Sequence, residues 1–463
     1  MRLMIGFVLI AAAGLAPAQE VTTDPLQSVT GYSSIQTALD ANPGKVLFVP
    51  SGDHVVSEPV RISTNGAGLW GYGRIVQSDA DQPIVVVQDA SEVRLEGVTL
   101  TRAAGAQESN RAGLHAVNCE RLTLENVQVL DNWANTGAIS LENCRGARVQ
   151  GCTVHNYKRI SVDDRTESDL YGYAFKVIDG TGIQATRSQG LQLLDNRVTE
   201  TRLMPDKETK EKFQLGQVTE GRKPRTVGKF NHTGDYFNNW HQGSAMVVTS
   251  PMETDHVLIR GNYIENAAQG IDMHVDNATC TQNIIKYAFV GIKCMHGSKN
   301  VIISDNNISY MDLWGLVMLP GSSSLPAAAA TGDQPARPAN YTRGNIIANN
   351  IFSGFGFGHE RWNWEKQRSG VISLESGQLP ENPVMVDVLV QGNIVYDTGR
   401  DQILQDGQPV TVPPLYNWAV YISPDPRPGL LFKDNIFHPG SDGISNLPLD
   451  EGVPAVEAPA ESR

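Results

Sequence analysis

A degenerate repeat runs through most of the chain and limits what it can fold into. Each copy reads as a short apolar strand, a small or acidic residue, in many copies Asn, then any residue and Ile or Val. The strand pieces are Val93–Leu95, Leu122–Leu124, Val257–Ile259, Val301–Ile303 and Val388–Val390. The turn pieces contain Asn196, Asn262, Asn283, Asn306, Asn349, Asn393 and Asn435. Because the strands alternate with a period of two and no helical pattern separates them, leucine-rich and ankyrin arrays are excluded.

The spacing of these Asn residues gives the size of one structural unit. Steps of 21 residues (262 to 283) and 23 residues (283 to 306) equal one coil of a solenoid. Later steps of 43 (306 to 349) and 42 (393 to 435) residues are either two ordinary coils or one coil carrying a loop. Units of this size bury an apolar face only against their neighbours, so the sequence predicts a stacked parallel β-helix.

The Asn column has a structural explanation, and we expect no chemistry from it. Asn tolerates left-handed backbone geometry at a sharp turn. Stacked Asn side chains can also hydrogen-bond to one another along the axis. Cys152 falls in the same column, so we expect it to point inward. Cys119 and Cys144 could form a disulfide, but we favour buried free thiols stacked between coils.

An amphipathic segment is placed to cap the start of the solenoid. Ser33 or Ser34 is a suitable N-cap for a helix that ends near Ala41, with Ile35, Ala38 and Leu39 on one face. Such a cap is needed because an open end exposes apolar strand edges.

The N-terminal segment also resembles a known superfamily. Residues 34–40 (SIQTALD), followed by 44–52 (GKVLFVPSG), resemble the start of the pectate lyase superfamily domain, also described as the rhamnogalacturonase/epimerase-like β-helix. With the repeats, the resemblance covers about residues 28–440. It implies an all-β fold over residues 28–445: a single-stranded right-handed parallel β-helix (solenoid) with an N-terminal capping helix. It also implies glycan binding along one sheet, but no single reaction, because lyases, hydrolases, epimerases and viral tail spikes share the fold.

The two ends of the chain and its charge suggest where it acts. Arg2, the apolar run Leu3–Leu15 and the small-x-small site Ala16–Ala18 predict a signal peptide over residues 1–18 and a secreted or periplasmic product. Residues 446–463, rich in Pro, Glu and Ala, are predicted to be a disordered tail. The net charge of −13 argues against nucleic acid or a membrane surface as partner. We expect a monomer that binds a polysaccharide.

The strongest functional signal lies on consecutive coils after residue 230. Aligning strands on Gly243, Gly270, Gly291 and Gly315 places Ile271, Met273, Ile292 and Cys294 inward. Asp272, His274 and Lys293 then point outward, with Asp272 and Lys293 about 4.8 Å apart on an exposed face. The candidate catalytic residues are Asp235, His241, Asp272, His274, Lys293 and His296. The alternative is a solvated outer face with an ordinary Asp–Lys pair.

Three breaks in the coil period, at residues 203–240, 322–343 and 359–367, are expected to wall the groove. They and an earlier strand supply aromatic and cationic side chains suited to sugar rings. The candidate substrate-binding residues are Tyr173, Lys176, Tyr236, Trp240, Arg361, Trp362 and Trp364. The run from Arg222 to Lys229 is either a basic patch for an anionic glycan or a solvated loop.

Three functions fit these residues, and we favour the first. β-Elimination on a uronate needs a base, here Lys293 or His241 oriented by Asp272, and a group that neutralises the carboxylate. No cofactor is certain, although Asp235 or Asp276 could hold Ca²⁺.

The second function is glycoside hydrolysis, which would pair Asp235 with Asp272, with His241 or His274 tuning one of them. The chain lacks the Gly-His-Gly segment typical of polygalacturonases, which weakens that particular activity. The third function is glycan binding without catalysis.

Overall fold

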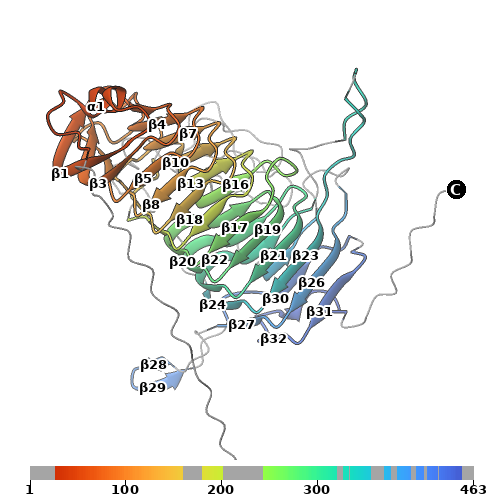
Figure 1. Ribbon diagram of the computed structural model, residues 1–463. Helices are drawn as coiled ribbons and strands as arrows, with labels where there is room; N and C mark the ends of the chain where they lie inside the picture. The colour runs from red at the N-terminus through yellow and green to blue at the C-terminus, as the bar shows by residue number, and fades with distance from the viewer. Residues whose placement is uncertain are drawn as a thin grey trace, which may run out of the picture.

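The computed structural model describes residues 27–159, 180–201, 243–320, 327–332, 334–355, 370–376, 383–397, 403–410, 414–425 and 427–450. Within these ranges, 31 strands join in one sheet that winds into a helix of stacked coils (Figure 1). The pairings between successive coils are parallel. The predicted signal peptide lies outside the described residues.

Each coil contributes a strand to up to three faces, which follow one another along the chain. The first face contains β2 (Val60–Ile62), β4 (Val85–Gln88), β7 (Leu114–Val117), β10 (Gly137–Glu142), β13 (Thr181–Thr186), β16 (Ser244–Thr249), the ends of β18 (Tyr263–Met273), β20 (Ile284–Cys294) and β22 (Asn307–Met318), and β25 (Gly370–Leu374), β30 (Trp418–Ile422) and β33 (Gly443–Ser445).

The second face contains the starts of β1 (Val46–Val56) and β3 (Gly68–Gln77), then β5 (Arg94–Glu96), β8 (Thr123–Glu125), β11 (Arg148–Gln150), β14 (Gln192–Leu194), β17 (Val257–Arg260), β19 (Asp276–Thr281), β21 (Lys299–Ser304), β23 (Arg343–Ala348), β26 (Val386–Gln391) and β31 (Leu430–Lys433).

The third face contains the ends of β1 and β3, then β6 (Thr99–Arg102), β9 (Gln128–Leu130), β12 (Thr153–His155), β15 (Arg197–Thr199), the starts of β18, β20 and β22, β24 (Ile351–Phe355), β27 (Ile394–Tyr396) and β32 (Ile436–Phe437). Two further strands, β28 (Ile403–Gln405) and β29 (Gln408–Val410), form an antiparallel hairpin.

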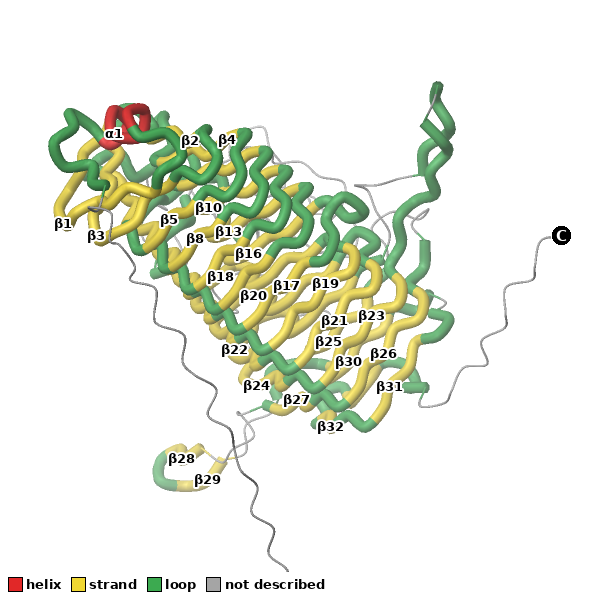
Figure 2. Tube along the Cα trace, viewed as in Figure 1, coloured by secondary structure: helices red, strands yellow, loops and turns green. Residues whose placement is uncertain are grey.

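The predicted capping helix is present at one end of the stack (Figure 2). Helix α1 (Ile35–Ala41) begins after Ser34, whose hydroxyl accepts a hydrogen bond from the backbone N–H of Thr37 at 3.0 Å. Its buried side chains are Ile35, Ala38 and Leu39, the predicted face. These side chains belong to the apolar core that runs through the coils, so the helix closes the end of that core.

The predicted Asn column is a continuous hydrogen-bonded ladder between the second and third faces. We call it the asparagine column; its members are Asn196, Asn262, Asn283, Asn306, Asn350, Asn393 and Asn435. Each Nδ2 donates to the Oδ1 of the next member, at 2.9 to 3.1 Å. Cys152 precedes Asn196 in the same column, as predicted, and its backbone N–H donates to Asn196 Oδ1. The direct contacts of Asn306 with Asn350 and of Asn350 with Asn393 show that the long steps are single coils carrying loops.

Two details of the predicted column are wrong. Asn350, not Asn349, is the member of the ladder. The ladder residues do not take the left-handed conformation; the residue before each one does, as at Gln282 (φ 58°), Asp305 (φ 56°) and Asn349 (φ 55°). Asn is therefore selected in this column for its amide, which both donates and accepts, and the adjacent position carries the turn.

The cysteines are also interior residues of the coils. All five cysteines are buried and unpaired, as we favoured. The Cys119 thiol donates to the carbonyl of Val117 at 3.3 Å, and the Cys144 thiol to that of Glu142 at 3.5 Å. They act as small fillers that satisfy carbonyl groups at the turns.

The last described residues close the other end of the stack. Asn446, the first residue of the predicted tail, accepts a hydrogen bond from the backbone of Ile422 and donates one back to it. The carbonyl of Asp450 accepts from Phe432 at 2.8 Å. Residues 446–450 thus contact the final coils, while 451–463 lie outside the described residues. Among the described residues, no helix is long and apolar enough to cross a membrane.

Candidate functional site

One outward position of the first face runs in register along the whole stack. We call it the outer column; its members are Arg61, Val86, His115, Ser140, Gln184, Val247, Asp272, Lys293, Val317, Ser373 and Tyr421. As predicted, the flanking Ile271, Met273, Ile292 and Cys294 point into the core, each with at most 1% of its surface exposed.

The predicted alignment of Gly243 with Gly270 is wrong by two residues. Val247 pairs with Asp272, and Ser244 pairs with Gln269. The Gly270, Gly291 and Gly315 alignment is correct, since Ile271, Ile292 and Leu316 are in register. A shift of two residues keeps every side chain on its face of the sheet, so the inward and outward assignments survive.

Asp272 is the centre of a compact polar cluster on this face. Its Oδ2 lies 3.1 Å from Lys293 Nζ, and its Oδ1 lies 3.0 Å from His274 Nε2. His274 reaches Asp272 because it follows the end of β18 directly, two residues after Asp272. The other ring nitrogen, His274 Nδ1, is 3.2 Å from the hydroxyl of Thr249 on the preceding coil.

The predicted exposure of this pair is wrong. Asp272 has 7% of its surface exposed, and the side chain of Lys293 has 13% exposed. The neighbouring Val317 is fully buried although it lies outside the core. The outer face is therefore covered at these coils, and a charge there is not simply solvated.

The charge state of Asp272 follows from its two partners. Burial alone would raise the pKa of this carboxyl, but Lys293 and His274 outweigh it and hold the pKa well below its ordinary value. Asp272 is thus ionised at any neutral or mildly acidic pH, and its carboxylate forms an ion pair with Lys293.

His296 completes the cluster and differs from its neighbours in charge. Its ring meets the ring of His274 edge to face, with centroids 4.3 Å apart. Burial, followed by the positive charges of His274 and Lys293, lowers the pKa of His296 to about 3. The imidazole is neutral at physiological pH. His296 also has a left-handed backbone, with φ 56°, a conformation that His adopts more often than most other non-glycine residues.

The remaining predicted site residues lie outside the described residues. These are Asp235 and His241 of the catalytic set, all seven substrate-binding candidates (Tyr173, Lys176, Tyr236, Trp240, Arg361, Trp362 and Trp364) and the basic run at 222–229. The cluster is therefore built from four of the six catalytic candidates, namely Asp272, His274, Lys293 and His296.

The structure adds a second polar group on the same face that we did not predict. The Ser373 hydroxyl donates to Glu375 Oε1 at 2.6 Å, and the Arg427 side chain, 4% exposed, lies beside this strand with Nη2 3.4 Å from the Leu374 carbonyl. No sequence signal pointed to Glu375, because Leu316 pairs with Ile372 and Gly370 is therefore one residue out of line with Gly291 and Gly315. Arg427 had none, because it is 53 residues from its contact.

The geometry does not assign a calcium site to Asp276. Its Oδ1 accepts a hydrogen bond from the Lys299 backbone at 3.1 Å, and burial raises the pKa of this carboxyl. Within the part of the chain that the structure describes, no three His, Cys, Asp or Glu side chains are grouped to hold a metal ion. Asp235, the other predicted calcium ligand, lies outside those ranges.

Known proteins resemble this chain in fold. A family described as "Right handed beta helix region" matches residues 75–209, in agreement with the predicted fold class. The tailspike protein of E. coli bacteriophage HK620, solved in complex with a pentasaccharide, superposes with a TM-score of 0.51 at 12% identity, covering 89% of this chain and 62% of that one.

Two other structures superpose comparably. Dettilon tailspike protein gives a TM-score of 0.50 at 14% identity, covering 93% and 66% of the two chains. DFA-IIIase from Arthrobacter chlorophenolicus A6, in complex with GF2, gives 0.50 at 12% identity, covering 94% and 98%. No curated protein sequence matches this chain.

Proposed function

We propose that this right-handed parallel β-helix protein is an exported enzyme that cleaves a uronate-containing polysaccharide by β-elimination. The observation that carries the proposal is the cluster on the first face: an ionised, buried carboxylate that holds a lysine and a histidine beside a neutral imidazole. Perturbed titratable groups gathered outside the core are typical of catalytic sites.

Lys293 is the group that neutralises the uronate carboxylate. β-Elimination removes the proton on C5, next to the carboxylate, so the negative charge that develops must be stabilised. The Lys293 ammonium is held 3.1 Å from Asp272 and is therefore fixed in position. This changes the role predicted from the sequence, where Lys293 was a candidate base: a lysine paired with an ionised carboxylate does not accept a proton.

His296 is the base. It is neutral, only partly buried, and adjacent to the Lys293–His274 pair. Its pKa is low because of burial and then because of the neighbouring His274 and Lys293; a bound uronate carboxylate would offset these two neighbours and raise that pKa when the substrate is in place. His296 takes the C5 proton, the C4–O bond breaks as the C4–C5 double bond forms, and the imidazolium returns the proton to the departing oxygen.

Asp272 is a positioning residue. It contacts Lys293 through one oxygen and His274 through the other, and its low pKa keeps it ionised throughout. It fixes the ammonium and limits the motion of the His274 ring against which His296 packs.

Glycoside hydrolysis fits the described residues less well. It needs two carboxyl groups about 5–9.5 Å apart, one of them protonated. Asp272 is held ionised, and Ser373, beside Glu375, is three coils away, about 14 Å. The predicted hydrolytic pair would depend on Asp235.

The fold comparisons are compatible with a glycan ligand, since the HK620 tailspike protein was solved with a pentasaccharide. Export is proposed from the N-terminal residues alone. The predicted aromatic residues of the loops would supply the walls of the groove.

The test is digestion of polygalacturonate, alginate and hyaluronan, with dextran as the uncharged control. We expect an ultraviolet-absorbing unsaturated product from at least one uronate polymer, and none with His296→Asn. His256→Asn, at an exposed histidine outside the cluster, is the matched control and should retain activity. New reducing ends without that absorbance would select hydrolysis, and saturable binding with neither would select a non-catalytic protein.

A further inference from the structure

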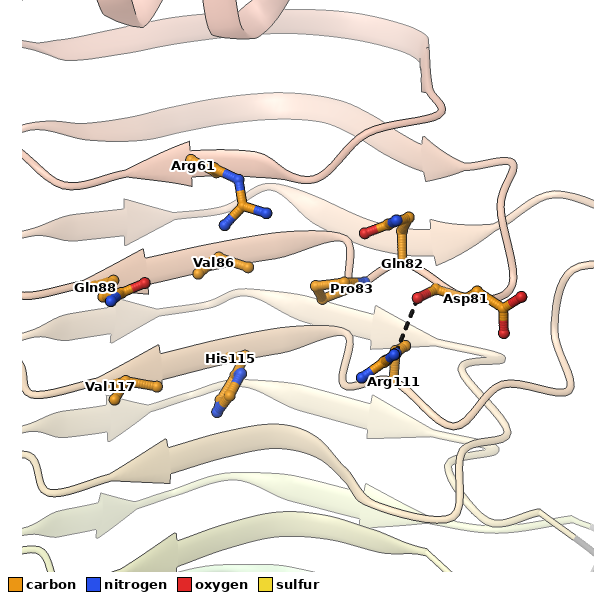
Figure 3. A pocket seen from close by; sticks show the side chains of 9 residues that line it. All are labelled: Arg61, Asp81, Gln82, Pro83, Val86, Gln88, Arg111, His115 and Val117. Atoms are coloured by element: carbon orange, nitrogen blue, oxygen red, sulfur yellow. Dashed lines mark hydrogen bonds between the residues drawn. The ribbon is translucent and has the colours of Figure 1, made fainter.

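A polar depression lies at the other end of the outer column. Its volume is about 360 Å³, within the range of small-molecule sites. It is formed by β2, β4 and β7 and the segment that leads into β4. Figure 3 shows the side chains of Arg61, Arg111 and His115 around Pro83 and Val86.

The depression and the Asp272 cluster share one track on the surface. Arg61, Val86 and His115 are members of the outer column, and each is paired in register with its neighbour. His115 is four coils from Asp272, through Ser140, Gln184 and Val247. At about 4.8 Å per coil, the two sites are roughly 19 Å apart along the same face.

The charge of the depression favours an anion. The Arg61 side chain is exposed and makes no hydrogen bond or ion pair with any residue that the structure describes, while its backbone N–H donates to Gln36 Oε1. The Arg111 guanidinium is anchored through Nε to the carbonyl of Asp81 at 2.9 Å, which leaves its terminal nitrogens to bind. Asp81 is the one carboxylate in the lining, and Glu142 lies nearby, 3.9 Å from His115 Nε2.

We infer that this depression is a distal subsite that binds a carboxylate-bearing sugar unit of the same glycan. The inference rests on the proposed function and adds a requirement on substrate length: the glycan must be long enough to reach both sites. Arg61 and Arg111 pair with the carboxylate, and Gln88 and His115 contact hydroxyl groups. Two weak contacts joined by one chain give a longer glycan higher affinity than either contact alone.

The test uses His115 as a reporter, because its ring lines the depression. The ring signals, assigned with His115→Gln, are followed by NMR while sodium glucuronate is added to the full chain, with glucose and sodium acetate as matched probes. Glucuronate should shift the His115 signals saturably and more strongly than either control. Arg61→Gln should weaken that binding about tenfold, and Arg145→Gln, which removes an exposed arginine in a turn off this face, should not.

Equal shifts with glucose or acetate, or unchanged binding by Arg61→Gln, would overturn the subsite. The measurement requires no turnover, so its outcome is separate from that of the digestion experiment. If glucuronate binds at His115 but the digestion yields no unsaturated product, the proposed elimination reaction is wrong and the subsite still stands.

Discussion

The asparagine column and the outer column both stack side chains in register along the axis, but they repeat differently. In the asparagine column the same residue recurs on successive coils, and each amide is satisfied by the next. In the outer column the residue type changes at every coil, from Arg61 through Val247 and Asp272 to Tyr421. A ladder needs identical partners, whereas a site needs different groups at defined places. Repetition in this fold therefore indicates structure, and variation along a face indicates function.

The largest effect should follow from Lys293→Met. Turnover should fall roughly 10²–10³-fold, because the charge that faces the developing carbanion is lost. The free energy of unfolding should also fall by about 3–5 kcal/mol, since Asp272 is left buried without its main partner. Steady-state kinetics and urea unfolding measure the two losses.

The double variant Asp272→Asn/Lys293→Met separates these losses. It should regain most of the stability, because no buried charge is left unpaired, yet stay inactive. Lys286→Met removes a lysine from the same strand, where its partner Glu265 is 3.5 Å away and half-buried, and should change neither property much. If the double variant is as active as the native protein, Lys293 has no role in the mechanism.

In the asparagine column, Asn283→Ala should act on stability. The Asn283 amide donates to Asn306 and Ile259, and its oxygen accepts from the backbone and side chain of Asn262. Its loss leaves several buried groups unsatisfied, so the free energy of unfolding should fall by about 3–5 kcal/mol. The remaining folded protein should be fully active.

Asn300→Ala is the control for that ladder effect. Asn300 belongs to an exposed pair and its side-chain amide donates to Asn277 Oδ1, so water can replace the bond. Its left-handed backbone (φ 54°) disfavours Ala, so the cost should be about 1–2 kcal/mol. Equal costs at the two positions would contradict a structural role specific to the buried column.

The pH dependence of stability should be set in part by His296. Its pKa is about 3 in the folded protein and about 6.5 in the unfolded chain. Between these values only the unfolded chain binds the proton, so stability falls as the pH falls through this window. Between pH 6.5 and 4.5, the free energy of unfolding should therefore fall by about 2 kcal/mol less in His296→Asn than in the native protein.

Thermal unfolding at several pH values measures this difference. Asp272 does not interfere, because its lowered pKa affects stability only below the ordinary Asp value of about 3.9. Parallel pH curves for the native protein and His296→Asn would show that His296 has an ordinary pKa.

The sequence predicted the features that local periodicity determines, namely the side of the sheet on which a side chain lies and its neighbour on the next coil. Alternation fixes that Asp272 points outward while Met273 points inward, and the coil step brings Lys293 beside Asp272. Burial could not be predicted this way, because exposure of an outer face depends on what lies over it. The register of Gly243 was missed for a related reason, since the insertion before it leaves no periodic strand from which to count. Arg427 could not be predicted either, because only the folded stack brings it beside Leu374, 53 residues away.

The smallest effect should come from the thiols, which are buried like the asparagine column. Burial raises the pKa of the Cys152 thiol to about 12, and likewise that of Cys294, so neither forms a thiolate at neutral pH. The native protein should not react with a thiol reagent, and a reductant should leave its melting temperature unchanged, because Cys119 and Cys144 are not bridged. The chemically unfolded chain, in which all five thiols react, is the control. A melting temperature lowered by the reductant would mean that a disulfide contributes to the stack, and the interior thiols would no longer belong with the structural columns.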